Sequence, residues 1–397
     1  MGSIDRLPSG HWRARYRDPY SRARSRSFAR KRDAALFLDT ASADMQRSVW
    51  VDPDAGRITL AEWAEAYLAT VVNLRPGTLA TYRRDLTRYI LPRLGTLPLS
   101  RLSALEIRAW LAEEIAGGRA PSSVHRHYRT LRRVLEVAME TEMLAKNPCS
   151  AVQPPAVPAT EMRFLSAAEV TDLAEAAGPW YATFIYTAAY TGLRLGELTA
   201  LRRKRLDLLR RTVTVSEQLT AVDGRLVWGE PKTKAGRRTL SIPDFLVDRL
   251  KGQLSERALP CPDGLVFPNG AGNPIAAPSF THNVFSKARR RSGLTGVRFH
   301  DLRHTAVALA IAHGAHPKAI QARMGHSSIQ VTLDRYGHLF PELDGHIAAG
   351  LDEIYRQAER ERANAGDADI LAIGQRSSSK ESSSMPQRSR RGSETIR

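Results

Sequence analysis

Cysteine is scarce in this chain, and long apolar runs are missing. Two cysteines, Cys149 and Cys261, stand far apart and outside any Cys-x-x-Cys motif, which argues against a disulfide framework and a cysteine-based zinc site. No apolar run reaches about 18 residues, and the polar, arginine-rich N-terminus lacks the pattern of a signal peptide. We therefore expect no membrane association and a cytoplasmic location.

Acidic residues are also in deficit. The 397 residues include 59 Lys and Arg against 41 Asp and Glu, which gives a net charge of +18 and a pI near 10.4. A protein this basic usually binds a polyanion; the simpler alternative is high solubility without such a partner. Hydrophobic residues make up 42% of the chain, and at this length they predict two or three domains with cores of their own.

Residues 1–55 show the two-residue period of β-strands. Arginines alternate with apolar residues, Asp18-Pro19 marks a turn, and the alternation then resumes. The apolar members are Trp12, Ala14 and Tyr16, and the arginines are Arg13, Arg15, Arg17, Arg22, Arg24 and Arg26. We predict a β-hairpin with the arginines on one face and the apolar residues on the other, followed by a helix over residues 31–46.

Residues 56–147 show the 3.6-residue period of helices. Apolar positions from Leu60 to Val71 follow one helical face, and Ser103-Ala104-Leu105-Glu106 has the capping-box spacing that opens another helix. The last helix, over residues 121–143, carries three arginines on one side: Arg126, Arg129 and Arg133. A charged stripe is usually a solvated face, but the excess of one sign here favours a surface that faces DNA.

Prolines then interrupt the helical pattern. Proline forbids continued helix and favours extended chain, so residues 148–162 are predicted to be an interdomain linker. Residues 163–345 mix helices with strands, and Asp223-Gly224 signals a hairpin turn between two strands. Residues 346–362 have the pattern of a short amphipathic helix, and the polar tail 363–397 is expected to be disordered.

One segment of the mixed region places an arginine where a helix can begin. Arg194 closely follows Gly192, so its guanidinium can bind a phosphate bidentately beside backbone N–H groups. Glu197 lies three residues on and can orient Arg194 from the same helical face. The structural alternative is a surface salt bridge on a helix.

Two later segments add histidines, a second arginine and a tyrosine. His300 and Arg303 are three residues apart on one helical face and can point at one spot; the alternative is a capping histidine with a solvated arginine. Gly325-His326 precedes Tyr336 by ten residues, and a lone tyrosine in this setting is usually a packing residue.

The order of these segments changes their interpretation. The series Arg…Lys…His-x-x-Arg…Gly-His…Tyr, all within residues 194–336, resembles the tyrosine recombinase family, also called phage integrases. The resemblance implies that two arginines clamp the scissile phosphate, that two histidines assist, and that a tyrosine is the nucleophile. The matching positions are Arg194 and Arg303, His300 and His326, and Tyr336.

The resemblance leaves two candidates for the lysine. The family's β-hairpin lysine should lie within residues 231–238, where the Pro-Lys-Thr pattern favours Lys232 and Lys234 is the alternative. Glu197 matches an acidic position that supports the first arginine. His304 and His338 are additional histidines, which we interpret as packing or supporting residues outside the catalytic set.

The resemblance also implies the fold and the chemistry. The expected fold class is α+β multidomain: a small N-terminal arm-type DNA-binding domain with a three-stranded sheet plus helix, an all-α core-binding (SAM-like) domain, and a mixed α/β catalytic domain. A free tyrosine has a pKa of about 10, and adjacent arginines would favour the phenolate and neutralise the phosphate. The expected product is a 3′-phosphotyrosine, formed without cofactor, metal or ATP.

The leading expectation is an integrase that inserts or excises a phage or other mobile element. Its expected partners are double-stranded DNA with core and arm sites, three further copies in a homotetramer, an excisionase and a host DNA-bending protein, all at the nucleoid. The alternatives are a Xer-like resolvase of chromosome or plasmid dimers, a type IB topoisomerase, and a DNA-binding protein that has lost catalysis.

Overall fold

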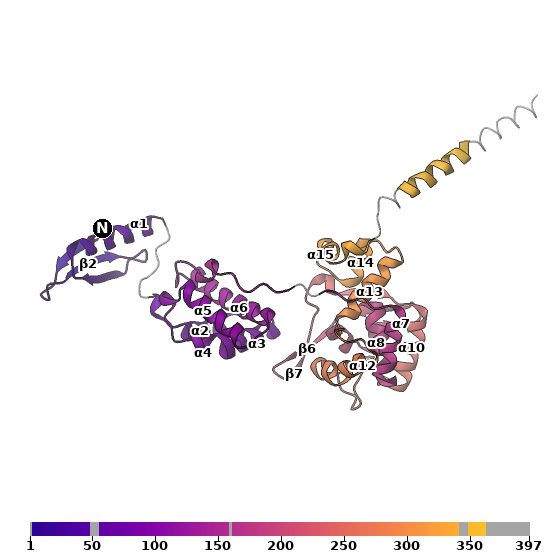
Figure 1. Ribbon diagram of the computed structural model, residues 1–397. Coiled ribbons are helices and arrows are strands. Elements are labelled where there is room, and N and C mark those ends of the chain that lie inside the picture. Colours follow the sequence, from indigo (N-terminus) through magenta and orange to yellow (C-terminus); the bar gives the residue numbers. More distant parts are fainter. Residues whose placement is uncertain (1, 48–54, 159–160, 341–347, 363–397) are drawn as a thin grey trace, which may run out of the picture.

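The computed structural model describes residues 2–47, 55–158, 161–340 and 348–362 (Figure 1). Its buried apolar side chains gather in separate cores: one in the N-terminal strands and helix, one in the central helices, and two in the C-terminal part. None of the helices in these ranges is long and apolar enough to cross a membrane.

The N-terminal unit is an antiparallel sheet covered by one helix. Its strands are β1 (Ser3–Arg6), β2 (Trp12–Arg17) and β3 (Ala23–Phe28), in the order β1-β2-β3, and its helix is α1 (Lys31–Gln46). Ala14 and Tyr16 of β2 pack against Ala34 and Leu38 of α1. The predicted helix over 31–46 is confirmed.

The prediction that all the arginines share one face of this sheet is wrong. In the register of β2 and β3, Arg24 lies opposite Tyr16, and Arg26 lies opposite Ala14. Residues directly opposite each other in an antiparallel pair point to the same face, so Arg24 and Arg26 lie on the helix-covered face. The arginines of β2 have odd residue numbers and those of β3 have even ones. In this register even-numbered residues pair with even-numbered residues, so the arginines of the two strands lie on opposite faces.

The central unit consists of helices around one core. They are α2 (Leu60–Thr70), α3 (Pro76–Asp85), α4 (Leu91–Leu94), α5 (Ala104–Ala116) and α6 (Pro121–Glu140). The Trp63 indole N–H donates to the Val134 carbonyl at 3.0 Å and joins α2 to α6. The side chain of Ser103 accepts the backbone N–H of Glu106 at 3.2 Å, so this half of the predicted capping box is confirmed, and the Glu106 carboxylate pairs with Arg93 at 3.3 Å.

The first residues of the predicted linker pack onto the central core. A short 3-10 turn, Pro148–Ala151, follows α6, and both Cys149 and Val152 are buried. The hydroxyl of Tyr128 donates to the carbonyls of both residues, at 2.7 and 2.9 Å. Because burial stabilises the neutral thiol, the pKa of Cys149 rises to about 12.

The C-terminal unit has helices packed around α8, with two small sheets. Its helices are α7 (Ala167–Ala177), α8 (Pro179–Thr191), α9 (Leu195–Thr199), α10 (Asp244–Glu256), α11 (Ala277–Phe280), α12 (Ser286–Arg291), α13 (Asp301–Ala312), α14 (Pro317–Met324) and α15 (Ile329–Tyr336). Helices α7, α10 and α13 each contact α8, which is buried along most of its length.

Two antiparallel sheets complete this unit. Their strands are β4 (Leu206–Asp207), β5 (Thr212–Val215) and β8 (Arg238–Ser241) in one sheet, and β6 (Gln218–Val222) and β7 (Arg225–Gly229) in the other. Asp223 and Gly224 both have positive φ, 48° and 78°, as a type I′ turn requires. The predicted hairpin turn is confirmed. In Figure 1 the β6–β7 ribbon reaches towards the central helices.

The last described segment is helical over residues 348–362. Its apolar residues Leu351, Ile354 and Tyr355 are each more than half exposed. The beginning of the predicted helix, residues 346–347, and the predicted disordered tail, residues 363–397, lie outside the described residues.

Candidate active site and DNA-binding surface

Arg194 takes its position from a tight turn between two helices. Helix α8 ends at Thr191, and Gly192 follows it with a φ of +69°; a Cβ there would lie 2.6 Å from the Met324 methyl group. The backbone N–H of Arg194 donates to Glu197 at 3.0 Å, and its guanidinium donates to the same carboxylate at 2.8 Å. The sequence therefore predicted this pairing correctly, and the pair begins α9.

Glu197 is held by a second arginine that the sequence reading did not single out. Arg238 of β8 forms an ion pair with Glu197 at 2.9 Å, and both side chains are nearly fully buried. Burial alone would raise the pKa of Glu197, but the bonds from Arg238 and Arg194 outweigh it and lower the pKa. No sequence spacing could reveal this contact, because the two residues are 41 positions apart.

Arg303 ties two turns of the site together. Its guanidinium donates to the Gly192 carbonyl at 2.6 Å and also to the Met324 carbonyl. Burial, together with the nearby charges of Arg194 and Arg238, lowers the pKa of Arg303 to about 9. It is therefore still protonated at neutral pH. Packing like charges at a buried place is costly, and an anion bound there would relieve that cost.

The two predicted histidines lie beside these arginines. His300 precedes α13 and remains partly open to solvent, while His326 follows the left-handed turn at Gly325 and is buried. His326 Nδ1 lies 2.9 Å from the Thr332 hydroxyl. Burial and the arginine charges lower the pKa of both histidines, that of His326 to about 4. Both are neutral at pH 7.

Tyr336 ends α15 and is almost completely buried, with 1% of its surface exposed. Its hydroxyl lies 2.6 Å from Nδ1 of His304. Burial raises the pKa of Tyr336, and the charges of Arg303 and Arg335 oppose that rise. His304 was expected to be a packing or supporting residue, yet it contacts the proposed nucleophile directly. The sequence held one indication of this contact: His304 lies one helical turn after His300 and so on the same face of α13.

The loop between β7 and β8 carries both candidate lysines. Lys232 and Lys234 are exposed there, so the structure does not choose between them. The loop packs closely against the turn before His326, since a Cβ added to Gly325 would lie only 2.7 Å from the Ala235 carbonyl. His338, the other additional histidine, lies after Tyr336, with its ring centroid 6.3 Å from that of Phe164.

An arginine of the central unit holds the same loop from outside. Arg75, just before α3, donates to the carbonyls of Pro231 at 3.2 Å and Lys232 at 2.8 Å. It lies 3.4 Å from the Glu230 carbonyl as well. The loop that carries the lysines is thus fixed by both units.

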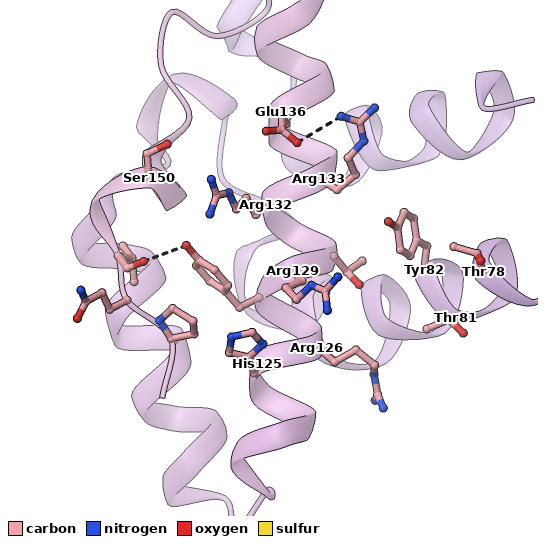
Figure 2. A pocket seen from close by; sticks show the side chains of 15 residues that line it. Thr78, Thr81, Tyr82, His125, Arg126, Arg129, Arg132, Arg133, Glu136 and Ser150 are labelled. Atoms are coloured by element: carbon pink, nitrogen blue, oxygen red, sulfur yellow. Dashed lines mark hydrogen bonds and ion pairs between the residues drawn. The ribbon is translucent and has the colours of Figure 1, made fainter. Parts of the chain in front are cut away.

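Helices α3 and α6 of the central unit flank a groove of about 910 Å³. Four arginines of α6 line it: Arg126, Arg129, Arg132 and Arg133. In Figure 2, Arg126, Arg129 and Arg133 lie on the side of Thr78, Thr81 and Tyr82 of α3, and Arg132 lies on the opposite side, towards Ser150. Arg126 bonds to Asp85 at 3.1 Å. Arg133 bonds to Glu136 at 3.2 Å and Glu140 at 3.1 Å.

Arg129 differs from its two partners in the predicted stripe. It is exposed, and within the described ranges no carboxylate lies at ion-pair distance from it. Arg132, which the sequence reading left out, is also exposed and lies beside Tyr128. Among the described residues, the positive charges of the groove that no carboxylate offsets are therefore those of Arg129 and Arg132.

The arginines of the N-terminal sheet are partly neutralised. Asp5 of β1 pairs with both Arg13 and Arg15 of β2, at 2.6 and 3.2 Å. Arg24 pairs with buried Asp18 at 3.1 Å. The remaining members of the set make other local contacts: Arg17 with the Ser21 carbonyl, Arg22 over the Tyr20 ring, and Arg26 over Phe28 and Phe37.

Comparison with known proteins assigns the chain to a family. Its models match three consecutive stretches: the phage integrase N-terminal domain over residues 1–47, the phage integrase central domain over 60–154, and the phage integrase family over 163–342. The prophage phiRv2 integrase of Mycobacterium tuberculosis (strain H37Rv) is 30% identical over 368 residues, covering 90% of this chain and 97% of that protein. The chain belongs to the phage integrase family of tyrosine recombinases.

Solved structures share the fold of this integrase. The Tn1549 transposon integrase in complex with a circular intermediate DNA has a TM-score of 0.64 at 22% identity, over 75% of this chain and 99% of that one. The lambda integrase tetramer bound to a Holliday junction has a TM-score of 0.53 at 20% identity, over 82% and 95%. These similarities confirm the predicted α+β recombinase fold.

Within the described part of this integrase, no group of three His, Cys, Asp or Glu side chains could hold a metal ion. The charges that act on the Tyr336 hydroxyl are those of Arg303 and Arg335. A tyrosine hydroxyl beside several guanidinium groups and neutral histidines can attack a phosphate diester and stabilise the added negative charge.

Proposed function

We propose that this integrase inserts and excises a mobile genetic element at a specific attachment site, with Tyr336 as the nucleophile. One observation carries the proposal: the charge of Arg303 acts on the buried hydroxyl of Tyr336, and the same arginine acts together with Arg194 on His326. Neutral histidines and charged arginines in one place suit a phosphate better than any uncharged substrate.

The proposed reaction follows from these positions. Tyr336 attacks the scissile phosphorus, Arg194 and Arg303 bind the non-bridging oxygens, and His300 and His326 donate hydrogen bonds to them. Lys232, with Lys234 as the alternative, protonates the departing 5′-oxygen. Glu197 holds Arg194 in place. Because the phosphotyrosine bond keeps the energy of the diester, rejoining needs no ATP, and the arginines supply the charge that a metal would otherwise bring.

Two surfaces are proposed to bind the DNA. The groove between α3 and α6 would face the core site, through Arg126, Arg129 and Arg133, so that the central and C-terminal units enclose the duplex. The N-terminal unit would bind arm sites through the face that carries Arg13, Arg15 and Arg17. Arg22, Arg24 and Arg26 remain candidates for arm contacts from the edge of the sheet.

The proposed partners are double-stranded DNA and further copies of this chain. The lambda integrase forms a tetramer on a Holliday junction, and we propose the same assembly here, with the exposed apolar residues of helix 348–362 docking on a neighbouring protomer. An excisionase and a host DNA-bending protein would set the direction. Because its substrate is double-stranded DNA, we propose that the protein acts at the nucleoid in the cytoplasm. We further propose the boundaries 1–55 and 163–345 for the outer domains. The central domain, predicted as 56–147, extends to Val152, which packs on its core.

A recombination assay tests this function. The probe is a plasmid that carries the DNA flanking the gene, paired with a plasmid that carries the matching host sequence. We expect the full chain to join the two plasmids in the presence of EDTA and without ATP. A version that lacks residues 1–47 should still cleave the core site yet fail to integrate. Integration by the shortened chain at the full rate would favour the Xer-like resolvase instead, and no joining by either would contradict the proposal.

Arg129 and Arg133 give a matched test of the groove. Arg129→Ala should weaken DNA binding and reduce the slope of log K against log salt by about 0.9, because one phosphate contact is lost. Arg133→Ala should have a smaller effect on both, because Glu136 and Glu140 already offset its charge. Fluorescence anisotropy over a salt series measures both values. Equal effects of the two substitutions would refute the role assigned to Arg129.

A further inference from the structure

The proposed reaction leaves one proton without a destination. The Tyr336 hydroxyl must lose its proton before or during attack, and none of the roles proposed for the arginines, His300, His326 or the lysine takes it. A phenol with a pKa of about 10 is a weak nucleophile at neutral pH, and burial raises the pKa of Tyr336 further. A nearby base is therefore needed.

His304 occupies the position of that base. Its Nδ1 atom lies 2.6 Å from the Tyr336 hydroxyl, within the range for direct proton transfer. Both side chains are buried, His304 at 5% and Tyr336 at 1% exposure, so bulk water does not compete for the contact. We propose that His304 accepts the phenol proton as the Tyr336 oxygen attacks the phosphorus. This inference rests on the function proposed above.

The protonation state of His304 suits this role. Burial lowers its pKa, Asp301 opposes that shift, and the nearby arginine charges add to it, so the ring is neutral and free to accept a proton at pH 7. The groups that face His304 are His300 with a ring centroid at 5.0 Å, Tyr336, Asp301, Arg298, Arg303 and Arg335. In the accepting form the ring proton sits on Nε2, which leaves Nδ1 open.

The step balances without any other reagent. The Tyr336 oxygen forms a bond to phosphorus as the bond from phosphorus to the 5′-oxygen breaks. The phenol proton moves to Nδ1 of His304, and the departing 5′-oxygen takes its proton from the loop lysine. Because the pKa of Tyr336 is raised and that of His304 is lowered, ionisation before attack is unfavourable. The proton therefore moves as the new bond forms, and religation returns it.

The substitution His304→Asn tests whether His304 acts as a base or only as a packing residue. The amide oxygen of asparagine takes about the place of Nδ1 and still accepts the hydrogen bond, but it is not basic. With a nicked duplex of the attachment-site junction, we expect the rate of covalent complex formation to fall by about 10²-fold or more. The wild-type rate should decline below the pKa of His304, and this limb should vanish in the variant. A variant that cleaves at the wild-type rate with the same pH profile would overturn the proposal.

A sulfur substrate distinguishes the base from the acid. In a duplex with a 5′-bridging sulfur at the scissile phosphate, the leaving thiolate needs no proton. A variant with Lys232→Ala and Lys234→Ala should recover on this DNA, whereas His304→Asn should remain slow. Recovery of His304→Asn would overturn the assignment. Circular dichroism and thermal melting check its fold, and His304→Gln is the second variant if asparagine is not tolerated. If the proposed function itself were wrong, the result would differ, because the wild-type chain would then cleave neither the ordinary duplex nor the sulfur duplex.

Discussion

Tyr336→Phe should bind attachment-site DNA normally and form no covalent complex with it. The substitution removes one oxygen atom, which is the proposed nucleophile, and leaves the ring in its apolar cluster with Ala306, Val307 and Met324. The loss of the bond to His304 should cost about 1 kcal/mol of stability, which leaves the chain folded. Denaturing gels with end-labelled DNA measure the covalent product, and mobility shifts measure binding.

Tyr190→Phe is the matched control for this result. Tyr190 lies in the same unit, and its ring packs against Phe245 at 4.8 Å between centroids, away from the arginine cluster. It should cleave at the wild-type rate. A labelled protein–DNA band from Tyr336→Phe would show that another residue is the nucleophile.

Arg303→Lys should lower the rate of cleavage by about 10³-fold, although it keeps the positive charge. Two N–H groups of Arg303 are occupied by the carbonyls of Gly192 and Met324. A planar guanidinium can hold these carbonyls and still present donors to a phosphate, whereas an ammonium group cannot match that geometry. Single-turnover rates at saturating enzyme isolate the chemical step from binding.

Arg298→Lys controls for the general effect of the exchange. Arg298 lies five positions earlier and pairs with Asp301 at 2.8 Å, with half of its side chain exposed. Its substitution should change the rate by no more than a few fold, because Arg298 is half exposed and lysine keeps the positive charge beside Asp301. If Arg303→Lys kept the wild-type rate and melting temperature, Arg303 would not be a phosphate ligand.

The local features of this fold could be predicted from the sequence. Helix α1, the cap at Ser103 and the turn at Asp223-Gly224 each depend on residues within a few positions of one another. The order of the chemical motifs likewise identified the region of Arg194 and Tyr336, because the motifs are short and their sequence order is distinctive. Their roles remain predictions until the variants are made.

Long-range contacts could not be predicted in the same way. Arg238 reaches Glu197, and Arg75 reaches the lysine loop 157 positions away, through contacts that leave no periodicity in either segment. The face of Arg24 depended on the register set by the turn, and not on alternation alone. His304 was interpreted as a packing or supporting residue because it is an additional histidine, outside the positions that match the family's motifs.

The strand order of the N-terminal unit has a consequence for how the chain behaves at high concentration. In the order β1-β2-β3, both outer strands have an unpaired edge, and such edges invite pairing with another copy. Strand β3 has Arg24 and Arg26 along its edge, and Asp18 offsets the charge of Arg24 only. Approach of two β3 edges therefore brings like charges together, so Arg26 should keep two copies of the free protein from pairing through this strand before they meet DNA.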